Sequence, residues 1–193
     1  MIERINEASP RVKARVAGVF YVLVFVTGGF ALAAGRNVAY RDAANLIATA
    51  CYVPVTLLFY DIFKPVSRSL SLLAAFFSLV GCAVGVLSFL HVATSPINSL
   101  VFFGFYCLLI GYLIVKSTFL PPILGVLMAI GGLGWLTFIW RPLASSLSPY
   151  NFAPGILGEG LLTIWLLVMG VNVQRWHEQA RTAGTGGGNA VHA

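Results

Sequence analysis

The sequence predicts an all-α protein, a polytopic bundle that crosses a membrane with six helices and keeps both termini on the cytoplasmic side. Of its 193 residues, 59% are apolar and 9% are charged, whereas soluble domains carry about 25% charged residues. Six apolar stretches each approach the roughly 20 residues that a helix needs to cross a bilayer. The lysine and arginine residues cluster beside the ends of these stretches, where such residues control topology.

The first three spans are expected at about residues 16–34, 43–63 and 70–93. Each is a continuous apolar run rather than an alternating pattern, which favours helices over the strands of a membrane barrel. Basic residues precede the first span, and Lys64-Pro65 ends the second. The first span, with Ala31-Leu32-Ala33 near its end, also resembles a secretory signal with its cleavage site, so its removal from the mature chain is an alternative.

The last three spans are expected at about residues 97–115, 121–140 and 152–173. Pro121-Pro122 and Pro154 suit the first turns of the fifth and sixth helices, where a missing N–H costs little. Residues 1–173 are therefore expected to form the membrane domain. After it, residues 174–181 are expected at the cytoplasmic interface, and the glycine-rich residues 182–193 are expected to be flexible and unstructured.

The distribution of basic residues predicts the orientation, because such residues are retained on the cytoplasmic side of a membrane. Nine of the twelve fall on the side of the two termini, and the other three, Arg36, Arg41 and Arg141, fall on the opposite side. This division predicts that both termini face the cytoplasm. The net charge of +6 indicates membrane lipids as partners, through their anionic headgroups, and nucleic acid is not expected as one.

No motif indicates a cofactor or a metal, and none is expected. Cys51, Cys82 and Cys107 each lie within an apolar run, without a CxxC pair. They are expected to be buried packing residues rather than metal ligands or a disulfide framework. The chain has no HExxH sequence and no glycine-rich phosphate loop after a strand. Whether the protein is an enzyme therefore stays open.

Ionisable residues within a span are costly in lipid and are functional candidates, and Glu159 is the clearest of them. It shares a helix face with Gly155, Thr163, Leu166 and Gly170, and small and polar faces mark helix contacts. Glu159 is therefore expected to point into the bundle. Two roles stay open, a ligand or proton site and a hydrogen bond between helices. A tightly packed site in which it bonds only to neighbouring helices would favour the second role.

His91 is expected near the outer end of the third span, on a face of small and polar residues that mark a helix contact. That face consists of Ser78, Gly81, Gly85, Ser88 and His91. Because His91 and Glu159 are expected in the same half of the membrane, a pair between them, near Arg141, is a hypothesis for a ligand or proton site. The alternative is an interfacial histidine that reaches the water at the headgroups.

Asp61 is expected at the cytoplasmic end of the second span, three residues before Lys64. Residues at this spacing share a helix face, so a partly solvated ion pair between the two is expected, with an inner gate or a headgroup contact as the alternative.

The aromatic residues leave more than one role open. Residues typical of either the membrane interface or packing are Trp135, Trp140, Trp165 and Tyr112. Candidates to line a cavity are Tyr106 and Asn98.

A more specific pattern runs through the last three spans. The segment FGFYCLLIGYLI at 103–114 continues through STFLP and PILGVL to residue 127, and WLLVMGV at 165–171 follows Glu159. With RVAGVFY at 15–21 and LLAAFF at 72–77, these segments resemble the bacterial membrane family catalogued as domain of unknown function 4386. The resemblance implies a six-span protein of the bacterial inner membrane with no assigned activity. It also implies that Glu159 occupies a position where the family tends to have an acidic residue.

Three functions are compatible with these observations. The protein binds or transports a small or lipidic ligand through a polar pocket in the outer leaflet, or it modifies a lipid with Glu159 as general acid or base. Alternatively it is a non-catalytic accessory subunit whose small-residue helix faces bind a second copy or another membrane protein. The lack of two similar halves weakens a standard transporter, and the lack of a second carboxylate or a metal cluster weakens the enzyme.

Overall fold

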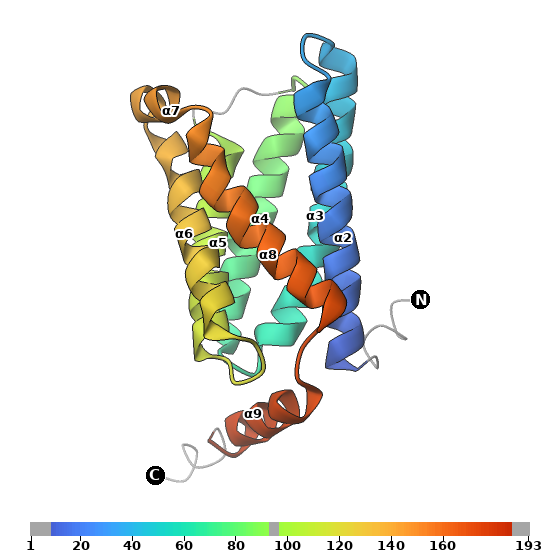
Figure 1. The fold of residues 1–193 in the computed structure, drawn as a ribbon, viewed down its shortest axis with the longest axis vertical. Coiled ribbons are helices and arrows are strands. Elements are labelled where there is room, and N and C mark those ends of the chain that lie inside the picture. Colours follow the sequence, from blue (N-terminus) through green and yellow to red (C-terminus); the bar gives the residue numbers. More distant parts are fainter. Residues whose placement is uncertain (1–8, 93–96, 187–193) are drawn as a thin grey trace.

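The computed structural model describes residues 9–92 and 97–186, and within them the chain is helical and contains no strand (Figure 1). Six helices are long and apolar enough to cross a membrane, so the protein is a multi-pass membrane protein. Successive spans are antiparallel neighbours in the bundle. The elements in chain order are α2 (Pro10–Ala33), α3 (Val38–Phe63), α4 (Arg68–Phe89), α5 (Ser99–Lys116), α6 (Pro122–Leu136), η1 (Thr137–Ile139), α7 (Arg141–Leu147), η2 (Tyr150–Phe152), α8 (Ala153–Val168) and α9 (Val173–Gly186).

Polar residues outside the apolar runs decide where the helices begin. The side chains of Ser9, Asn37, Ser67 and Asn98 each accept a hydrogen bond from a backbone N–H in the first turn of α2, α3, α4 and α5. Such caps satisfy donors that a helix cannot pair internally. The first three helices therefore start two to six residues before the predicted spans (10 against 16, 38 against 43, and 68 against 70).

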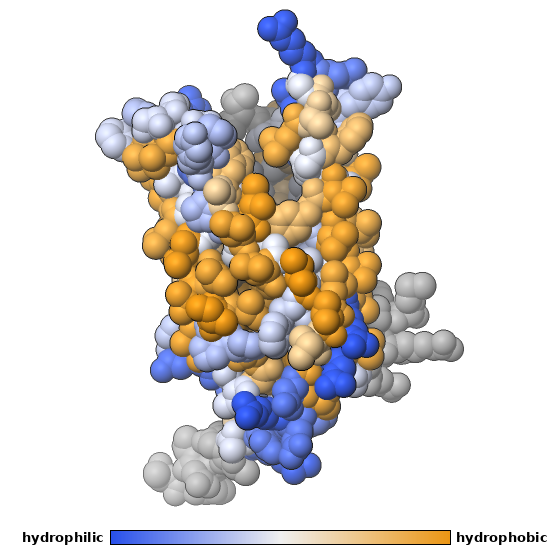
Figure 2. Space-filling model, in the orientation of Figure 1, coloured by the Kyte–Doolittle hydropathy of each residue, from blue (hydrophilic) through white to orange (hydrophobic). Residues whose placement is uncertain are grey.

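On the surface, hydrophilic residues lie mainly at the two ends of the bundle, and apolar side chains cover much of the surface between them (Figure 2). We name these ends the α9 end and the α7 end, after the helix that lies at each. Arg36, Arg41 and Arg141 lie at the α7 end, and the other basic residues of the described chain lie at the α9 end. Arg4 lies outside the described residues. The structure thus has the predicted division of charge, while the side that faces the cytoplasm stays a prediction.

Helices α5 and α6 pack closely against each other, and two glycines make this possible. A Cβ placed on Gly111 would lie 2.6 Å from the Gly125 carbonyl oxygen, and one placed on Gly125 would lie 2.5 Å from the Gly111 carbonyl oxygen. These two backbones therefore exclude any larger side chain. Close backbone contact at small residues is how helices associate in lipid, where apolar side chains gain little by leaving one apolar solvent for another.

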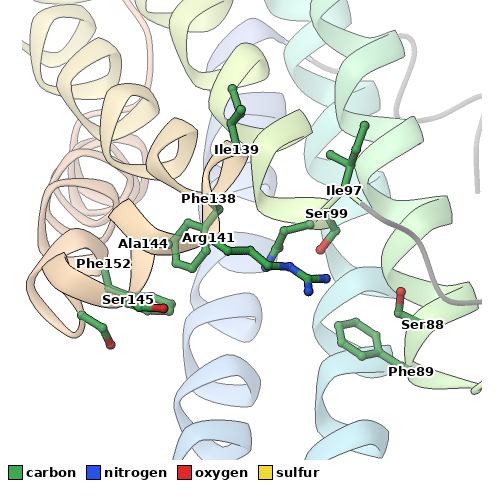
Figure 3. A pocket seen from close by; sticks show the side chains of 12 residues that line it. Ser88, Phe89, Ile97, Ser99, Phe138, Ile139, Arg141, Ala144, Ser145 and Phe152 are labelled. Carbon is green, nitrogen blue, oxygen red and sulfur yellow. The ribbon is translucent and has the colours of Figure 1, made fainter.

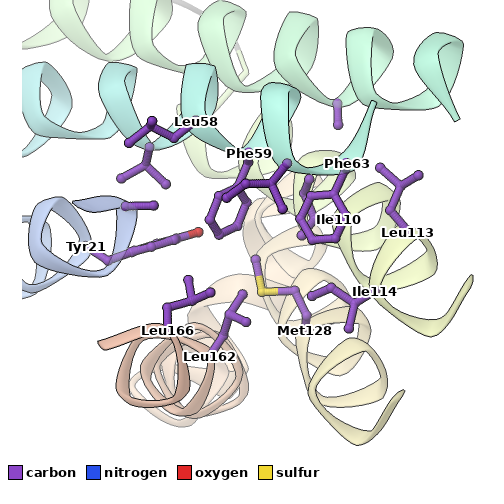
Figure 4. Packing of buried hydrophobic residues seen from close by; sticks show 14 of the residues in the cluster. Tyr21, Leu58, Phe59, Phe63, Ile110, Leu113, Ile114, Met128, Leu162 and Leu166 are labelled. Atoms are coloured by element: carbon purple, nitrogen blue, oxygen red, sulfur yellow. The ribbon is translucent and has the colours of Figure 1, made fainter. Parts of the chain in front are cut away.

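The interior between the helices is filled by large apolar side chains (Figure 4). Tyr21 of α2, Phe59 of α3, Met128 of α6 and Leu162 of α8 are each at most 2% exposed. Their contacts, together with the buried face of α5, tie the spans into one core. This core lies around the middle of the bundle and below it toward the α9 end, and the polar residues described below are set into it.

The last span ends earlier than predicted, at Val168 rather than near residue 173. Gly170 has a φ of +67°, a left-handed conformation that glycine adopts at the end of a helix without a steric penalty. The chain then turns into α9 at the end of the bundle (Figure 1). Trp176 of α9 donates its indole N–H to the Ile62 carbonyl at 2.8 Å, and Gln179 accepts the backbone N–H of Thr118 at 3.0 Å.

The prediction that residues 182–193 are unstructured is wrong for the part that the structure describes. Helix α9 continues to Gly186, and the Thr182 hydroxyl bonds back to the carbonyls of Glu178 and Gln179 within it. Residues 187–193 lie outside the described residues.

Candidate functional site

Glu159 lies in the middle of the membrane span and inside the bundle, 7% exposed. From Glu159 to Val168, the end of α8, the helix rises about 14 Å at 1.5 Å per residue, which is about half of a hydrocarbon core of roughly 30 Å. The other members of its predicted face that belong to α8, Gly155, Thr163 and Leu166, are also buried. The small and polar face therefore packs against neighbouring helices, as its composition predicts.

Three other helices supply the hydrogen-bond donors of this carboxyl group. Trp135 of α6 donates its indole N–H to Oε1 at 2.8 Å, and Cys107 of α5 places its thiol 3.7 Å from the same oxygen. Tyr52 of α3 donates its hydroxyl to Oε2 at 3.1 Å. Within the described chain, Glu159 is bonded to neighbouring helices and has no Lys, Arg or His partner. This packing favours a role in holding the helices together.

Two more tyrosines extend these contacts into a buried polar cluster. The Tyr21 and Tyr52 hydroxyls lie 3.2 Å apart, and the rings of Tyr52 and Tyr106 pack at 5.8 Å. Tyr106 is fully buried, and its hydroxyl has no hydrogen-bond partner among the described residues. Five helices thus converge on one site. The buried polar cluster consists of Tyr21, Tyr52, Tyr106, Cys107, Trp135 and Glu159.

The expected pair between His91 and Glu159 is not formed. Helix α4 ends at Phe89, and His91 has a φ of +54°, so it does not continue the helical face that the spacing assumed. Its Nε2 lies 2.9 Å from Asp42 Oδ2, and its side chain is 68% exposed. His91 is therefore a residue of the α7 end, as the alternative interpretation had it, and it lies outside the buried polar cluster.

Arg141 lies apart from both His91 and Glu159. It begins α7, a short helix that the sequence did not predict, and its side chain extends across a groove toward Ser99 (Figure 3). The groove has a volume of about 630 Å³. We name it the Arg141 groove. Its lining residues are Ser88, Phe89, Ile97, Asn98, Ser99, Phe138, Ile139, Arg141, Ala144, Ser145, Ser148 and Phe152.

Aromatic contacts connect the groove to the buried polar cluster. Phe138 and Phe152 line the groove, and both rings pack on Trp135, with centroid distances of 6.5 Å and 5.7 Å. Trp135 in turn donates to Glu159. One layer of aromatic rings therefore separates the carboxyl group from the groove, and a change in the position of these rings would reach Glu159.

At the α9 end, Asp61 forms the ion pair with Lys64 that their spacing predicts. It also pairs with Lys13 of α2, a contact that the sequence did not indicate. The side chains of Asp61 and Lys13 are 19% and 11% exposed. Asp61 therefore joins α2 to α3 at the membrane boundary, on the opposite side of the buried polar cluster from the Arg141 groove.

The model of the family described as domain of unknown function (DUF4386) matches residues 35–98 and 97–170, the greater part of the chain. The chain belongs to this family. It is also similar to an uncharacterised protein of Archaeoglobus fulgidus, with 29% identity over 127 residues that cover 61% of this chain and 76% of that protein. No solved structure matches the chain.

The DUF4386 match contains the Arg141 groove and the buried polar cluster except for Tyr21. Tyr52, Tyr106, Trp135 and Glu159 of the buried polar cluster lie within the matched residues, and so does Arg141. Tyr21 precedes them. Sequence reasoning identified Glu159 and Arg141 as candidates and treated Tyr106 as a cavity residue, but it did not indicate Tyr21 or Tyr52. Their signal is weak, because a tyrosine in an apolar run looks the same whether its hydroxyl is bonded in the core or lies at the interface.

Proposed function

We propose that this DUF4386 protein binds an anionic amphiphile, a membrane lipid with a negatively charged headgroup, in the Arg141 groove. The observation that carries the proposal is the Arg141 guanidinium, an exposed charge that has no acidic partner among the described residues. A guanidinium presents five N–H donors in a planar arrangement that matches the oxygens of a carboxylate or a phosphate. No aspartate or glutamate is among the groove residues, so an anion meets no like charge there.

The rest of the lining supports a ligand that is part polar and part apolar. Ser88, Ser99 and Ser145 supply hydroxyl groups, and Phe89, Phe138 and Phe152 supply aromatic surface. Binding sites for organic ligands combine apolar walls with a few polar groups that fix orientation in this way. A phosphate headgroup at Arg141 with an acyl chain against the rings uses both kinds of surface.

The position of the groove supports a membrane lipid as the source of this ligand. The groove lies where α4 ends and α5 begins, and helix ends of a membrane protein lie near the headgroups. The distribution of basic residues predicts that the α7 end faces outside, and with that orientation the proposed site belongs to the outer leaflet of a bacterial inner membrane. A lipid can enter such a site sideways, without leaving the bilayer.

A lipid-modifying activity has less support. Its candidate general acid or base, Glu159, does not line the groove, and the ring of Trp135 with Phe138 and Phe152 lies between them. Transport across the membrane needs a path that continues beyond the groove, and no observation above supplies one. Binding is therefore the function that we propose.

The test is lipid retention by the purified protein in native mass spectrometry, with phosphatidylglycerol as the anionic lipid and phosphatidylcholine as the neutral one. We expect the wild type to retain one phosphatidylglycerol in preference to phosphatidylcholine. Loss of a charged hydrogen bond costs about 1.5–3 kcal/mol, so Arg141→Gln should weaken retention about 10- to 100-fold. The matched control is Arg36→Gln, which removes an exposed charge at the same end outside the groove.

Three results would contradict the proposal. One is equal retention of both lipids by the wild type. The other is a loss in Arg36→Gln as large as that in Arg141→Gln, which would indicate a general surface charge rather than the groove. Retention of inorganic phosphate without any preference for the lipid would also contradict it, because the aromatic walls would then have no part in binding.

A further inference from the structure

We infer that the buried polar cluster is a proton-binding site, in which Oε2 of Glu159 carries the proton and the hydroxyls of Tyr52 and Tyr21 pass it to and from that atom. This inference does not rest on the Arg141 groove, because it concerns a different set of residues. It goes beyond the helix-joining role because a purely structural carboxyl group would keep one protonation state.

The carboxyl group of Glu159 is surrounded by uncharged groups. Glu159 is buried in the middle of the membrane, and the groups that bond to it are an indole, a phenol and a thiol. None of these is a cation. A carboxylate in this position is held by neutral donors alone, which only partly replace the water that it has lost. A change in pH or in the surroundings can therefore convert Glu159 between its protonated and its ionised form.

The geometry assigns the proton to one of the two oxygens. Oε1 faces the indole N–H of Trp135 and the thiol of Cys107. An indole N–H only donates, so Oε1 is an acceptor in both states of the carboxyl group. Oε2 faces the Tyr52 hydroxyl, which can either donate or accept. Oε2 can therefore gain and lose a proton without leaving a neighbouring group unpaired.

The hydroxyl chain can adapt to both states. When Glu159 is ionised, Tyr52 donates to Oε2 at 3.1 Å and can accept from Tyr21 at 3.2 Å. When Oε2 carries the proton, it donates to Tyr52, which then turns its own proton toward Tyr21. Transfer along the chain moves the Tyr52 proton to Oε2 and the Tyr21 proton to Tyr52. Tyr21 then takes up a proton from a hydronium ion of the solvent, so both tyrosines end neutral and Glu159 changes from a charge of −1 to zero.

Tyr106 supplies an independent observation that this cluster is built for more than packing. Its hydroxyl is fully buried and has no hydrogen-bond partner among the described residues. A buried, unpaired hydroxyl is costly and calls for an explanation. Beside the Tyr52 ring, it can serve as a further polar group for the proton or for a hydroxyl that reorients during transfer.

The titratable groups that face Glu159 are few, so its protonation can be followed spectroscopically. They are Tyr21 of α2, Tyr52 of α3, and Tyr106 and Cys107 of α5, while α6 contributes Trp135, which does not titrate. Cys82 of α4 lies near Tyr106. Phenols and thiols are ordinarily neutral at pH 7, so the carboxyl group is the member of the cluster that changes charge at acidic to neutral pH.

The experiment is infrared spectroscopy of the full chain in lipid nanodiscs, with ¹³C-labelled glutamate so that glutamate carboxyl bands shift away from those of aspartate. We expect a protonated-carboxyl C=O band that disappears as the pH rises and that Glu159→Gln abolishes. Glutamine keeps an acceptor for Trp135 and offers a donor to Tyr52, so the helix contacts persist. The control Glu178→Gln, in the exposed part of α9, should leave the band unchanged.

A second variant tests the route of the proton. Tyr52→Phe keeps the ring and removes the hydroxyl next to Oε2, so hydrogen–deuterium exchange of the carboxyl band should slow at least tenfold. A labelled glutamate band that keeps one protonation state at every pH where the protein stays folded would overturn the proton site. Exchange in Tyr52→Phe as fast as in the wild type would overturn the route. The wild-type titration decides the matter even where a variant fails to fold.

Discussion

Trp135 of α6 and Glu159 of α8 share a hydrogen bond of 2.8 Å in the middle of the bundle. The same indole ring carries Phe138 and Phe152 on the side of the Arg141 groove. This one side chain therefore connects the buried polar cluster to two aromatic residues that line the Arg141 groove.

Replacement of Trp135 by phenylalanine tests the contribution of this bond. The substitution leaves Oε1 of Glu159 without its best donor, and an unmet buried acceptor costs about 1–3 kcal/mol. We expect the free energy of unfolding in mixed micelles to fall by this amount. Trp140→Phe is the control, since Trp140 is 63% exposed. Equal losses in the two variants would mean that ring size rather than the hydrogen bond is responsible.

Because Gly155 has no side chain, the Trp135 indole can pack directly against the backbone of α8. A Cβ on Gly155 would overlap the indole, whereas a Cβ on Gly160, in the same helix, meets nothing within 4 Å. Gly155→Ala should therefore displace the indole and cost about 1–3 kcal/mol, the usual cost of overpacking. Gly160→Ala should be neutral or stabilising by up to about 1 kcal/mol, because alanine favours helices. Unfolding of both variants in the same micelles gives the comparison, and an equal effect would contradict the packing described here.

Asp61 should contribute to stability by joining α2 to α3. Asp61→Asn removes the ionic contacts with both Lys13 and Lys64, and we expect a loss of about 1–3 kcal/mol, between the values for exposed and buried pairs. Asp42→Asn is the matched change at the other end, where the partners Arg41 and His91 are 42% and 68% exposed and neither is as buried as Lys13, at 11%. High salt should narrow the difference between the variants. A larger loss in Asp42→Asn would contradict this ranking.

The orientation of the chain is open to a direct test. Ser146→Cys in α7 and Gln174→Cys in α9 place one thiol at each end of the bundle, at exposed positions. In intact bacterial cells, a membrane-impermeant maleimide should label the first and should label the second only after the membrane is broken. The parent chain, with Cys51, Cys82 and Cys107, gives the background. The reverse pattern would contradict the predicted cytoplasmic termini and move the groove to the inner leaflet.

The spans could be predicted because lipid demands long apolar runs, and the sequence contains six of them. Their ends were less certain, since capping by Ser9 or Asn37 and the left-handed turn at Gly170 depend on single residues. Helix α7 was not predicted, because seven residues beside an apolar run carry no periodic signal of their own. The fifth predicted span ends at residue 140, directly before α7 begins.

The site was predictable in part. The small and polar face of α8 indicates that Glu159 points inward, and the structure has it there. Its partners could not be predicted, because Tyr52 lies 107 residues away in the chain and nothing in an apolar span indicates which tyrosine hydroxyl is bonded. The pair with His91 was wrong because helical spacing was extended past Phe89, where the helix ends. Arg141 lies at the α7 end, in a groove rather than beside Glu159.

The measurement that tests the central claim most directly is an experimental structure of the protein in nanodiscs that contain phosphatidylglycerol. We predict density for a lipid headgroup in the Arg141 groove, within hydrogen-bonding distance of the Arg141 guanidinium, with its acyl chain against Phe138 or Phe152. An unoccupied groove under these conditions, with lipid density in contact with Glu159 instead, would contradict the account.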